Sequence, residues 1–320
     1  MLYWLIPLTV ILFFCLISLI VSLVAFFYAF YAPRPASDEE NEIPIPPGEE
    51  YLPYTARMSE WVVKARALEC MEVEVVSFDG LKLCGKYYEY KNGAPIEIMF
   101  HGYRGSAQRD LSGGVDRAFR VGHNALIVDH RAAGKSEGRV ITFGKKESRD
   151  VLSWIDFVLE NIDENAKIIL TGISMGAATV LMSTSQKLPE NVLYVLADCG
   201  YSGSEKIIKK VMRQMHLPIG PVYPFVALAA RIFGGFTLDE PSPAEAMEKC
   251  KIPVIFFHGN ADAFVPMEMS EENYEACAAE HKRLVIIDGA PHGACFPHNE
   301  ELYINEIVEF EKKIGCRSRS

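Results

Sequence analysis

Ser174 stands in a Gly-x-Ser-x-Gly pattern, flanked by Gly172 and Gly176. The apolar run 167–170 comes just before the pattern, and the run of small residues 177–184 comes just after it. This order predicts a strand, a sharp turn and a helix, with the serine hydroxyl raised at the tip of the turn. Side chains in place of the two glycines would crowd the turn and the helix behind it. The pattern therefore indicates a serine nucleophile.

A serine hydroxyl is a poor nucleophile unless a histidine takes its proton and a carboxylate holds that histidine. His292 follows an apolar run near the end of the chain and is the candidate base. Asp262 follows the preceding apolar run and is the candidate acid. Asp288 and Asp198 also end predicted strands and remain rival acids. Serine, base and acid together predict transfer of an acyl group to water.

The elements that must position these residues alternate along the chain. Strands are expected at 96–100, 125–128, 167–170, 192–197, 254–257 and 284–287, and helices at 108–121, 147–161, 177–188, 267–279 and 301–314. A hairpin that turns at Asp79-Gly80 is expected before them. Gly113-Gly114 is expected to interrupt the first helix. Apolar strands between helices predict a mostly parallel sheet covered on both faces, with reactive groups at the carboxyl ends of its strands.

Six blocks of residues, each placed after a predicted strand, resemble the α/β-hydrolase superfamily. They are 101–105, 129–138, 172–176, 198–201, 258–262 and 291–293, within a region of resemblance from about 73 to 314. The chain looks like the membrane-anchored, small-cap serine hydrolases of bacterial type in this superfamily, which are esterase-like or peptidase-like. The resemblance implies the α/β-hydrolase fold and a catalytic triad of Ser174, His292 and Asp262.

The oxyanion of the tetrahedral intermediate requires two aimed N–H donors. In this fold the residue after the nucleophile supplies one donor, which here is the backbone N–H of Met175. The loop after the first parallel strand supplies the other, and the backbone N–H of Tyr103 is the candidate. His101 and His258 begin His-Gly pairs at strand ends and are expected to shape their loops.

Neither a metal nor a cofactor is expected, because neither of these two histidines has a histidine or carboxylate partner at ligand spacing. Asp129 and Arg131 are expected to form a structural pair or a cap. The formal net charge of −10 argues against nucleic acid as a partner. The eight scattered cysteines show no disulfide spacing and favour a reducing compartment.

The chain divides into three predicted regions. Residues 1–32 carry no charged side chain and are long enough for a transmembrane anchor, with a cleaved signal peptide or a buried core helix as the alternatives. Residues 33–53 alternate acidic residues with proline and predict a semi-extended linker between membrane and domain. Residues 54–316 are expected to form the hydrolase domain. A long insertion at about 202–248 is expected to be a helical cap over the active site, or else a structural insertion without substrate contact.

The expected location is a membrane that the chain crosses once. The basic residues after the apolar segment favour a cytoplasmic domain, but anchored hydrolases also face outward, so the side stays open, as does the oligomeric state. The expected activity is cleavage of an ester of a small or lipid-derived acyl group. A peptidase of the same fold and a catalytically silent, membrane-tethered binding module are the alternatives.

Overall fold

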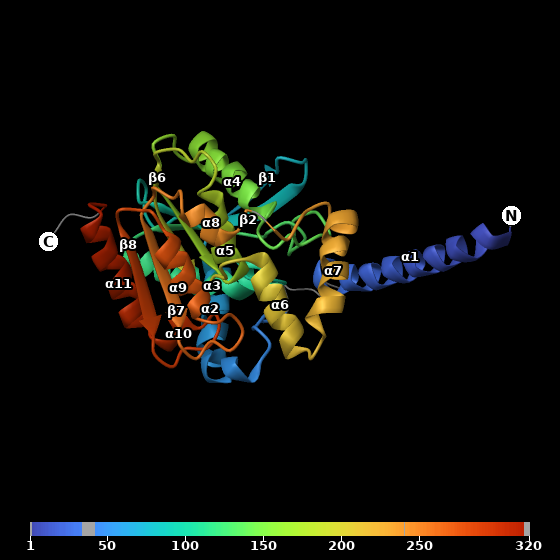
Figure 1. Ribbon diagram of the computed structural model, residues 1–320. Coiled ribbons are helices and arrows are strands. Elements are labelled where there is room, and N and C mark those ends of the chain that lie inside the picture. Colours follow the sequence, from blue (N-terminus) through green and yellow to red (C-terminus); the bar gives the residue numbers. More distant parts are fainter. Residues whose placement is uncertain (1, 34–41, 240, 317–320) are drawn as a thin grey trace.

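The computed structural model describes residues 2–33, 42–239 and 241–316 (Figure 1). Its centre is an eight-stranded sheet with the order β1-β2-β4-β3-β5-β6-β7-β8. β1 and β2 form the predicted antiparallel hairpin, β2 pairs antiparallel with β4, and the strands from β4 to β8 pair in parallel. The strands are β1 (Met71–Val76), β2 (Lys82–Tyr88), β3 (Ile96–Phe100), β4 (Asn124–Val128), β5 (Ile168–Ile173), β6 (Val192–Asp198), β7 (Val254–Gly259) and β8 (Lys282–Ile287). This is the predicted α/β-hydrolase fold.

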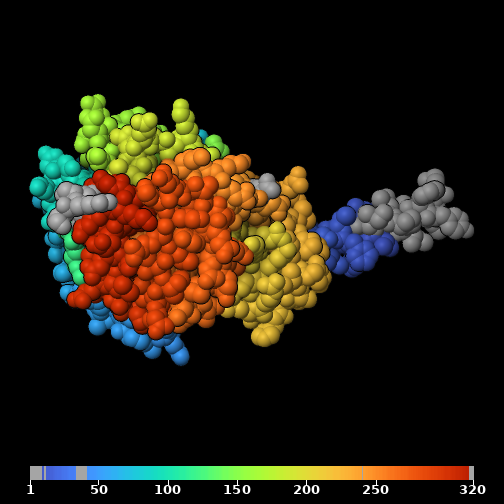
Figure 2. Space-filling model, turned by 60° about the vertical axis from the view of Figure 1, so that its left-hand side comes forward, coloured from blue at the N-terminus to red at the C-terminus, as the bar shows by residue number. Residues whose placement is uncertain are grey.

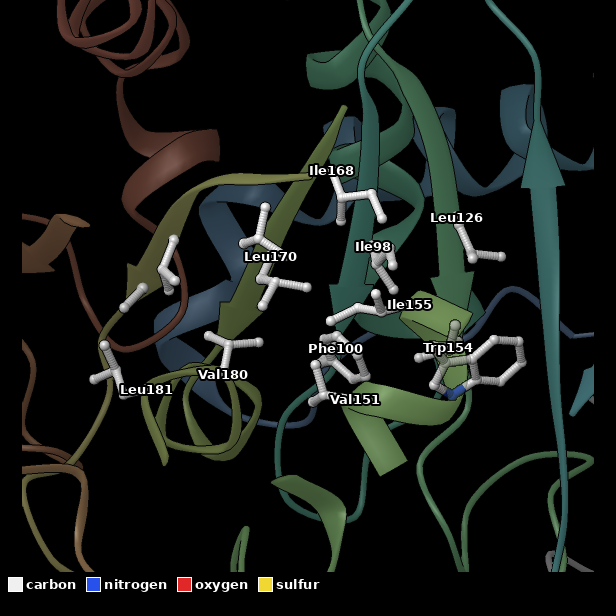
Figure 3. Close-up of a cluster of buried hydrophobic side chains, with 14 of the residues drawn as sticks. Ile98, Phe100, Leu126, Val151, Trp154, Ile155, Ile168, Leu170, Val180 and Leu181 are labelled. Carbon is white, nitrogen blue, oxygen red and sulfur yellow. The ribbon is translucent and has the colours of Figure 1, made fainter. Parts of the chain in front are cut away.

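Helices cover both faces of this sheet, as the apolar strands predict. On one face, Val151 and Trp154 of α4 pack with Val180 of α5 against Ile98 and Leu170 (Figure 3). On the other face, side chains of α2, α3 and α11 pack against the strands. The helices of these two layers are α2 (Thr55–Ala67), α3 (Ala107–Val121), α4 (Glu147–Asn161), α5 (Met175–Ser183), α9 (Glu268–Ala276), α10 (Cys295–His298) and α11 (Glu300–Lys313).

Helix α3 is continuous through Gly113-Gly114, where the sequence predicts an interruption. A Cβ on Gly113 would lie 2.6 Å from the ring of Trp61, and a Cβ on Gly114 would lie 2.7 Å from the sulfur of Met99. The two glycines therefore let α2 and β3 approach the helix closely, and packing on both sides outweighs their low helix propensity.

Helix α1 (Leu2–Ala29) projects from the body of the molecule, and its carboxyl end is built into that body (Figures 1 and 2). Just past the helix, Tyr31 forms an antiparallel β-bridge with Val140. The ring of Phe30 is fully buried and makes edge contacts with Phe143 and Phe236. The apolar helix and the domain therefore meet directly, without a spacer between them.

The second half of the predicted linker, residues 42–53, is in part packed on the domain and is not a solvated tether there. Residues 34–41 lie outside the described residues. After them, the 3-10 helix η1 (Glu49–Tyr54) leads directly into α2, and Tyr51 is buried against the domain. The proline and glutamate content indicated a tether, but the aromatic ring of Tyr51 gives the segment apolar surface to bury.

The insertion predicted as a cap contains α6 (Ser204–Gln214), α7 (Ile219–Ala229), the π-helix η2 (Ala230–Gly234) and α8 (Pro243–Met247). Val226 and Ala229 of α7 share a buried cluster with Phe26 at the end of α1. Figure 2 shows the corresponding part of the surface beside the base of the projecting helix. The described part of this insertion therefore packs around the end of α1.

A buried ionic cluster joins β3 to α3 and α11. Glu97 is fully buried and binds both Arg117 and His123. His123 also lies 2.9 Å from Glu311 through Nε2. Burial alone would lower the pKa of His123, but its hydrogen bonds to Glu311 and Glu97 outweigh burial and raise the pKa to about 9.

We predict that this histidine makes stability depend on pH. Because its pKa is raised in the folded chain, its stabilisation is fully present below about pH 6.5, the value for a free histidine, and is lost as pH rises towards 9. In chemical denaturation the wild type should lose stability across this window. At low pH His123→Gln should have a smaller free energy of unfolding than the wild type, and that free energy should not show the fall with pH that His123 causes. The half-buried His281→Gln is the control and should keep it; equal slopes for wild type and His123→Gln would contradict the prediction.

Candidate active site

Ser174 occupies the turn between β5 and α5, with the left-handed backbone angles φ 56° and ψ −116°. This conformation is uncommon for a residue with a side chain, and the surroundings enforce it. A Cβ on Gly172 would overlap the backbone of Gly176, and a Cβ on Gly176 would overlap the carbonyl oxygen of Phe100. The two glycines of the sequence pattern therefore allow the tight turn that was predicted.

The structure brings together the three residues that the sequence singled out for the triad. His292, in the loop after β8, lies with Nε2 2.9 Å from the Oγ of Ser174. Its Nδ1 lies 2.7 Å from the Oδ2 of Asp262, in the loop after β7. A carboxylate only accepts hydrogen bonds, so Nδ1 carries the proton and Nε2 is left to accept from the serine hydroxyl. The geometry suits proton transfer from serine to histidine.

Asp262 is held as a carboxylate by several partners. Its Oδ1 accepts hydrogen bonds from the backbone amides of Phe264 and Val265, both at 2.8 Å. Its Oδ2 lies 3.1 Å from the Nε2 of His258 as well as facing His292. Burial raises the pKa of Asp262, but the hydrogen bonds with the two histidines outweigh it and hold the pKa well below the usual range.

His258 is a part of the site that sequence reasoning understated. It was expected to shape its loop, and its Nε2 does lie 2.9 Å from the carbonyl oxygen of Val265. The same nitrogen also faces Asp262, and Nδ1 lies 2.6 Å from the hydroxyl of Ser270. The sequence did carry a signal for this contact, because His258 lies at the end of β7 and only four residues before Asp262.

The rival acids lie elsewhere. Asp288 accepts a hydrogen bond from the side chain of Asn260 at 2.8 Å in an exposed loop. Asp198 accepts from the hydroxyl of Tyr303 at 3.0 Å, and burial raises its pKa. Asp262 is therefore the carboxylate that the structure places against Nδ1 of His292.

The two candidate oxyanion donors belong to segments next to the serine, since Met175 follows it in the chain and a Cβ on Gly102, the residue before Tyr103, would lie 3.5 Å from the Cβ of Ser174. Met175 is the first residue of α5, so its amide has no carbonyl partner within the helix. Tyr103 lies in the loop after β3, and its hydroxyl donates to the carbonyl of Ala29 at 2.8 Å. The next residue, Arg104, donates from Nη2 to the carbonyl of Tyr28 at 2.7 Å. The loop that carries the candidate donor is therefore tied to the end of α1.

Other polar residues near the strand ends have structural partners. His101 Nε2 accepts a hydrogen bond from the backbone amide of His130 at 3.1 Å, in line with the expected loop-shaping role. Asp129 and Arg131 were expected to form a structural pair or a cap, and the structure shows the second of these roles for Asp129. Arg131 pairs with Asp150 at 2.6 Å, and Asp129 acts as a cap for backbone amides of neighbouring segments.

A cavity of about 450 Å³ adjoins Ser174 and His292. Its walls are largely apolar, and they include residues of α2, α3, α10 and the linker. Representative wall residues are Pro46, Tyr51, Met58, Trp61, Leu111 and Phe296. Described residues of the insertion at 202–248 do not line it, which favours the alternative of a structural insertion over a substrate-contacting cap. Residues of the predicted linker line the cavity instead.

Cys199, Asp262 and His292 have potential ligand atoms within 4.8 Å of one another. The thiol of Cys199 is fully buried, and burial raises its pKa well above the ordinary value. A protonated thiol is a poor metal ligand, and the two other residues are already hydrogen-bonded to each other. The group therefore fits proton transfer better than metal binding.

Comparisons with known proteins agree with this fold. An esterase from Pyrococcus furiosus is 25% identical, with a TM-score of 0.62 over 78% of this chain and 94% of the esterase. Est1E from Butyrivibrio proteoclasticus, solved with ferulic acid, is 21% identical, with a TM-score of 0.59 over 77% of this chain and 100% of Est1E. The likeness to these solved structures concerns the fold.

Relatives by sequence include two bacterial proteins. YqkD of Bacillus subtilis is 27% identical over 191 residues, which are 59% of this chain and 62% of YqkD. The match thus spans less than two thirds of that relative. YfhR of Escherichia coli strain K12 is 26% identical over 250 residues, which are 74% of this chain and 79% of YfhR.

The family model of the X-Pro dipeptidyl-peptidases (S15 family) matches residues 34–208, which is more than half of the chain. The matched region contains β1 to β6 and Ser174, and it ends before Asp262 and His292. The chain belongs to the S15 family and is a hydrolase of the esterase and peptidase type with the α/β-hydrolase fold.

Proposed function

We propose that the chain is a serine hydrolase that cleaves an ester of a small or lipophilic acyl group through a covalent acyl-enzyme. The observation that carries this proposal is the 2.9 Å contact between Ser174 Oγ and His292 Nε2 beside the apolar cavity. A nucleophile within hydrogen-bond reach of its base, with that base held by a third group, is the arrangement that acyl transfer requires.

In the proposed reaction, Oγ of Ser174 attacks the ester carbonyl carbon while its proton passes to His292 Nε2. The carbon–oxygen bond to the leaving alcohol then breaks, and the alcohol takes that proton from the histidine. Water repeats the sequence on the acyl-enzyme and releases the acid. Asp262 keeps the imidazole in the required tautomer and stabilises its cation.

The backbone amides of Met175 and Tyr103 are the proposed oxyanion donors. In the described part of the chain, neither amide donates a hydrogen bond to another residue, so both are free to bind the oxyanion. One such donor contributes on the order of 3 kcal/mol to the transition state. The loop of Tyr103 is held in place by the bond from Gly102 N–H to Asp110 Oδ2 at 3.1 Å.

Two observations support an ester as the substrate. The cavity beside the serine offers apolar walls, which favour an acyl chain over a polar peptide. The similar structures include esterases, and a relative from Aspergillus aculeatus that is 31% identical over 114 residues is named a thiohydrolase.

A dipeptidyl-peptidase is the second candidate because of the family model. Such an enzyme must bind the free ammonium group of its substrate. Of the carboxyl groups that line the cavity, Asp110 is paired with Arg109 and Asp198 is buried, so the exposed carboxylate of Glu50 is the candidate for this role. A silent binding module is disfavoured, because nothing but catalysis requires the strained serine and its bonded histidine.

Paired substrates separate the two candidates. The full chain is assayed on p-nitrophenyl esters from acetate to laurate and on alanyl-prolyl p-nitroanilide, beside Ser174→Ala. We expect ester turnover that falls by at least about a thousandfold in Ser174→Ala, because serine, base and acid act as a unit. Efficient cleavage of the anilide with only background ester turnover would replace the esterase proposal with the peptidase. Equal ester turnover by both proteins would overturn Ser174 as nucleophile.

We further propose that α1 is a single-pass membrane anchor. Leu12–Ala29 has a mean hydropathy of 2.6 and only 11% of this stretch is buried, which disfavours a core helix. Its exposed apolar side chains include Leu12, Phe13 and Phe14. A cleaved signal peptide is disfavoured because cleavage after Ala29 would remove the buried Phe26 and the carbonyl oxygens of Tyr28 and Ala29, which Arg104 and Tyr103 bind.

Membrane fractionation with intact-mass analysis tests the anchor. We expect the chain to stay in the membrane pellet after alkaline carbonate washing and to keep its N-terminal segment, because an apolar spanning helix resists extraction. A surface charge mutant, Lys64→Glu, serves as the control and should fractionate in the same way. Release by carbonate, or a mature chain that begins after residue 32, would contradict the proposal.

A further inference from the structure

Helix α7 is apolar on its exposed side as well as on its buried side. On the buried side, Val226 and Ala229 pack with Phe26 of α1. On the exposed side, which η2 continues, apolar residues recur at intervals of three or four and form what we call the outer stripe: Pro221, Pro224, Leu228 and Ile232. A helix that is apolar all round is normally buried on every side. The outer stripe therefore requires a covering from outside the described chain.

The length of α1 sets the level at which α7 lies. Burial along α1 begins at Ser22 and continues with Phe26, whereas Leu19 and Ile20 are exposed. Residues 2–21 precede this contact with the domain, and at about 1.5 Å per residue they reach about 30 Å along the helix axis. That length matches the hydrocarbon core of a bilayer, which is about 30 Å thick. If this part of α1 crosses a bilayer, the bilayer surface lies where α7 packs on Phe26.

The direction of α7 suits a position on that surface. Figure 1 shows α7 running crosswise to α1 at its base, as the outermost element of the body on the side from which α1 projects. An α1 that crosses the bilayer therefore brings α7 to lie along its plane. The most apolar stretch of α1, Leu12–Ala29, ends beyond Ser22, so a bilayer centred on that stretch would reach still further onto α7.

The segment that carries the outer stripe is basic, although the chain as a whole has a net charge of −10. Residues 206–238 contain no acidic residue and five basic ones, which are Lys206, Lys209, Lys210, Arg213 and Arg231. Lys206 and Lys209 pair with nearby carboxylates, whereas Arg213 and Arg231 are exposed. Basic residues beside an apolar stripe are typical of helices that lie in the surface of an anionic bilayer. A symmetric dimer through the stripe would instead bring two copies of Arg231 together, so lipid is favoured over a second copy of the chain.

We propose that the outer stripe lies at the boundary between headgroups and acyl chains of the bilayer that α1 crosses. The domain then binds an anionic lipid surface through the insertion at 202–248 as well as through α1. This rests on the proposed anchor, because the level of the bilayer surface follows from α1. Two attachments fix the orientation of the domain on the membrane. Such a role agrees with the finding that described residues of the insertion do not line the cavity.

Electron paramagnetic resonance of nitroxide labels on the full chain tests the position of the outer stripe. Leu228→Cys and Ile232→Cys carry the label in vesicles of phosphatidylcholine and phosphatidylglycerol. The more accessible native cysteines are first removed as Cys15→Ala, Cys70→Ala and Cys316→Ala. Leu302→Cys on α11 is the matched control, because its exposed fraction is 36% against 37% for Leu228, and α11 lies across the body from α1 (Figure 1). Leu16→Cys reports on the anchor itself.

We expect oxygen, which concentrates in lipid, to relax the labels at positions 228, 232 and 16 severalfold more than a water-soluble nickel complex does. The label at position 302 should show the reverse, because it faces water. Thermal unfolding of each labelled chain checks that it is folded. Labels at positions 228 and 232 that respond like the one at 302, while position 16 responds as in lipid, would overturn the surface contact and leave the anchor standing. A water-exposed label at position 16 would overturn the anchor and the contact together.

A label at position 228 that neither reagent reaches would show that protein covers the outer stripe, and would also overturn the proposal. A second readout needs no substitution. The unmodified chain is irradiated in the same vesicles with a photoreactive phospholipid, and the adducts are mapped by peptide mass spectrometry. We expect adducts on the peptide that contains the outer stripe as well as on α1. Adducts on α1 alone would contradict the contact of α7 with lipid.

Discussion

The backbone of α5 lies so close to β3 that a Cβ on Gly176 would overlap the carbonyl oxygen of Phe100. This close approach sets the angle at which the chain leaves β5, and it forces Ser174 into a left-handed conformation. The serine hydroxyl then faces the loops after β7 and β8, where Asp262 and His292 lie. Met175 begins the helix directly after the serine, so its amide has no carbonyl partner within α5. The relative positions of nucleophile, base and candidate oxyanion donor all depend on this contact.

Helix α1 is connected to the same region from the opposite direction. Tyr103 and Arg104 bind carbonyl oxygens at its carboxyl end, which are the groups that a helix leaves without internal partners. Phe30 fills a pocket between Phe143 and Phe236. The loop that carries the candidate oxyanion donor is thus supported by the segment proposed to cross the membrane. The carboxyl end of α1 would therefore both hold the domain at the membrane and fix the loop of Tyr103 at the active site.

The sequence was sufficient for the parts of the structure that follow from local signals. The elbow at Ser174, the alternation of strands and helices along the chain, and the positions of Asp262 and His292 follow from short motifs next to apolar strands. The cavity walls did not follow, because they depend on contacts between distant segments. Nothing near Trp61 indicated that it would stack on Phe296, and composition assigned Tyr51 to a solvated linker. Gly113-Gly114 suggested a break in a helix because their packing partners, Trp61 and Met99, are remote in sequence.

Reaction with a fluorophosphonate probe tests whether His292 activates Ser174. The full chain is labelled beside His292→Ala and a His281→Gln control, and the modified residue is mapped by peptide mass spectrometry. We expect rapid labelling of Ser174 in the wild type and the control, and labelling slowed by orders of magnitude in His292→Ala, because the serine then lacks its base. A folded wild type that does not react, or one that reacts at a residue other than Ser174, would show that Ser174 is not an activated nucleophile.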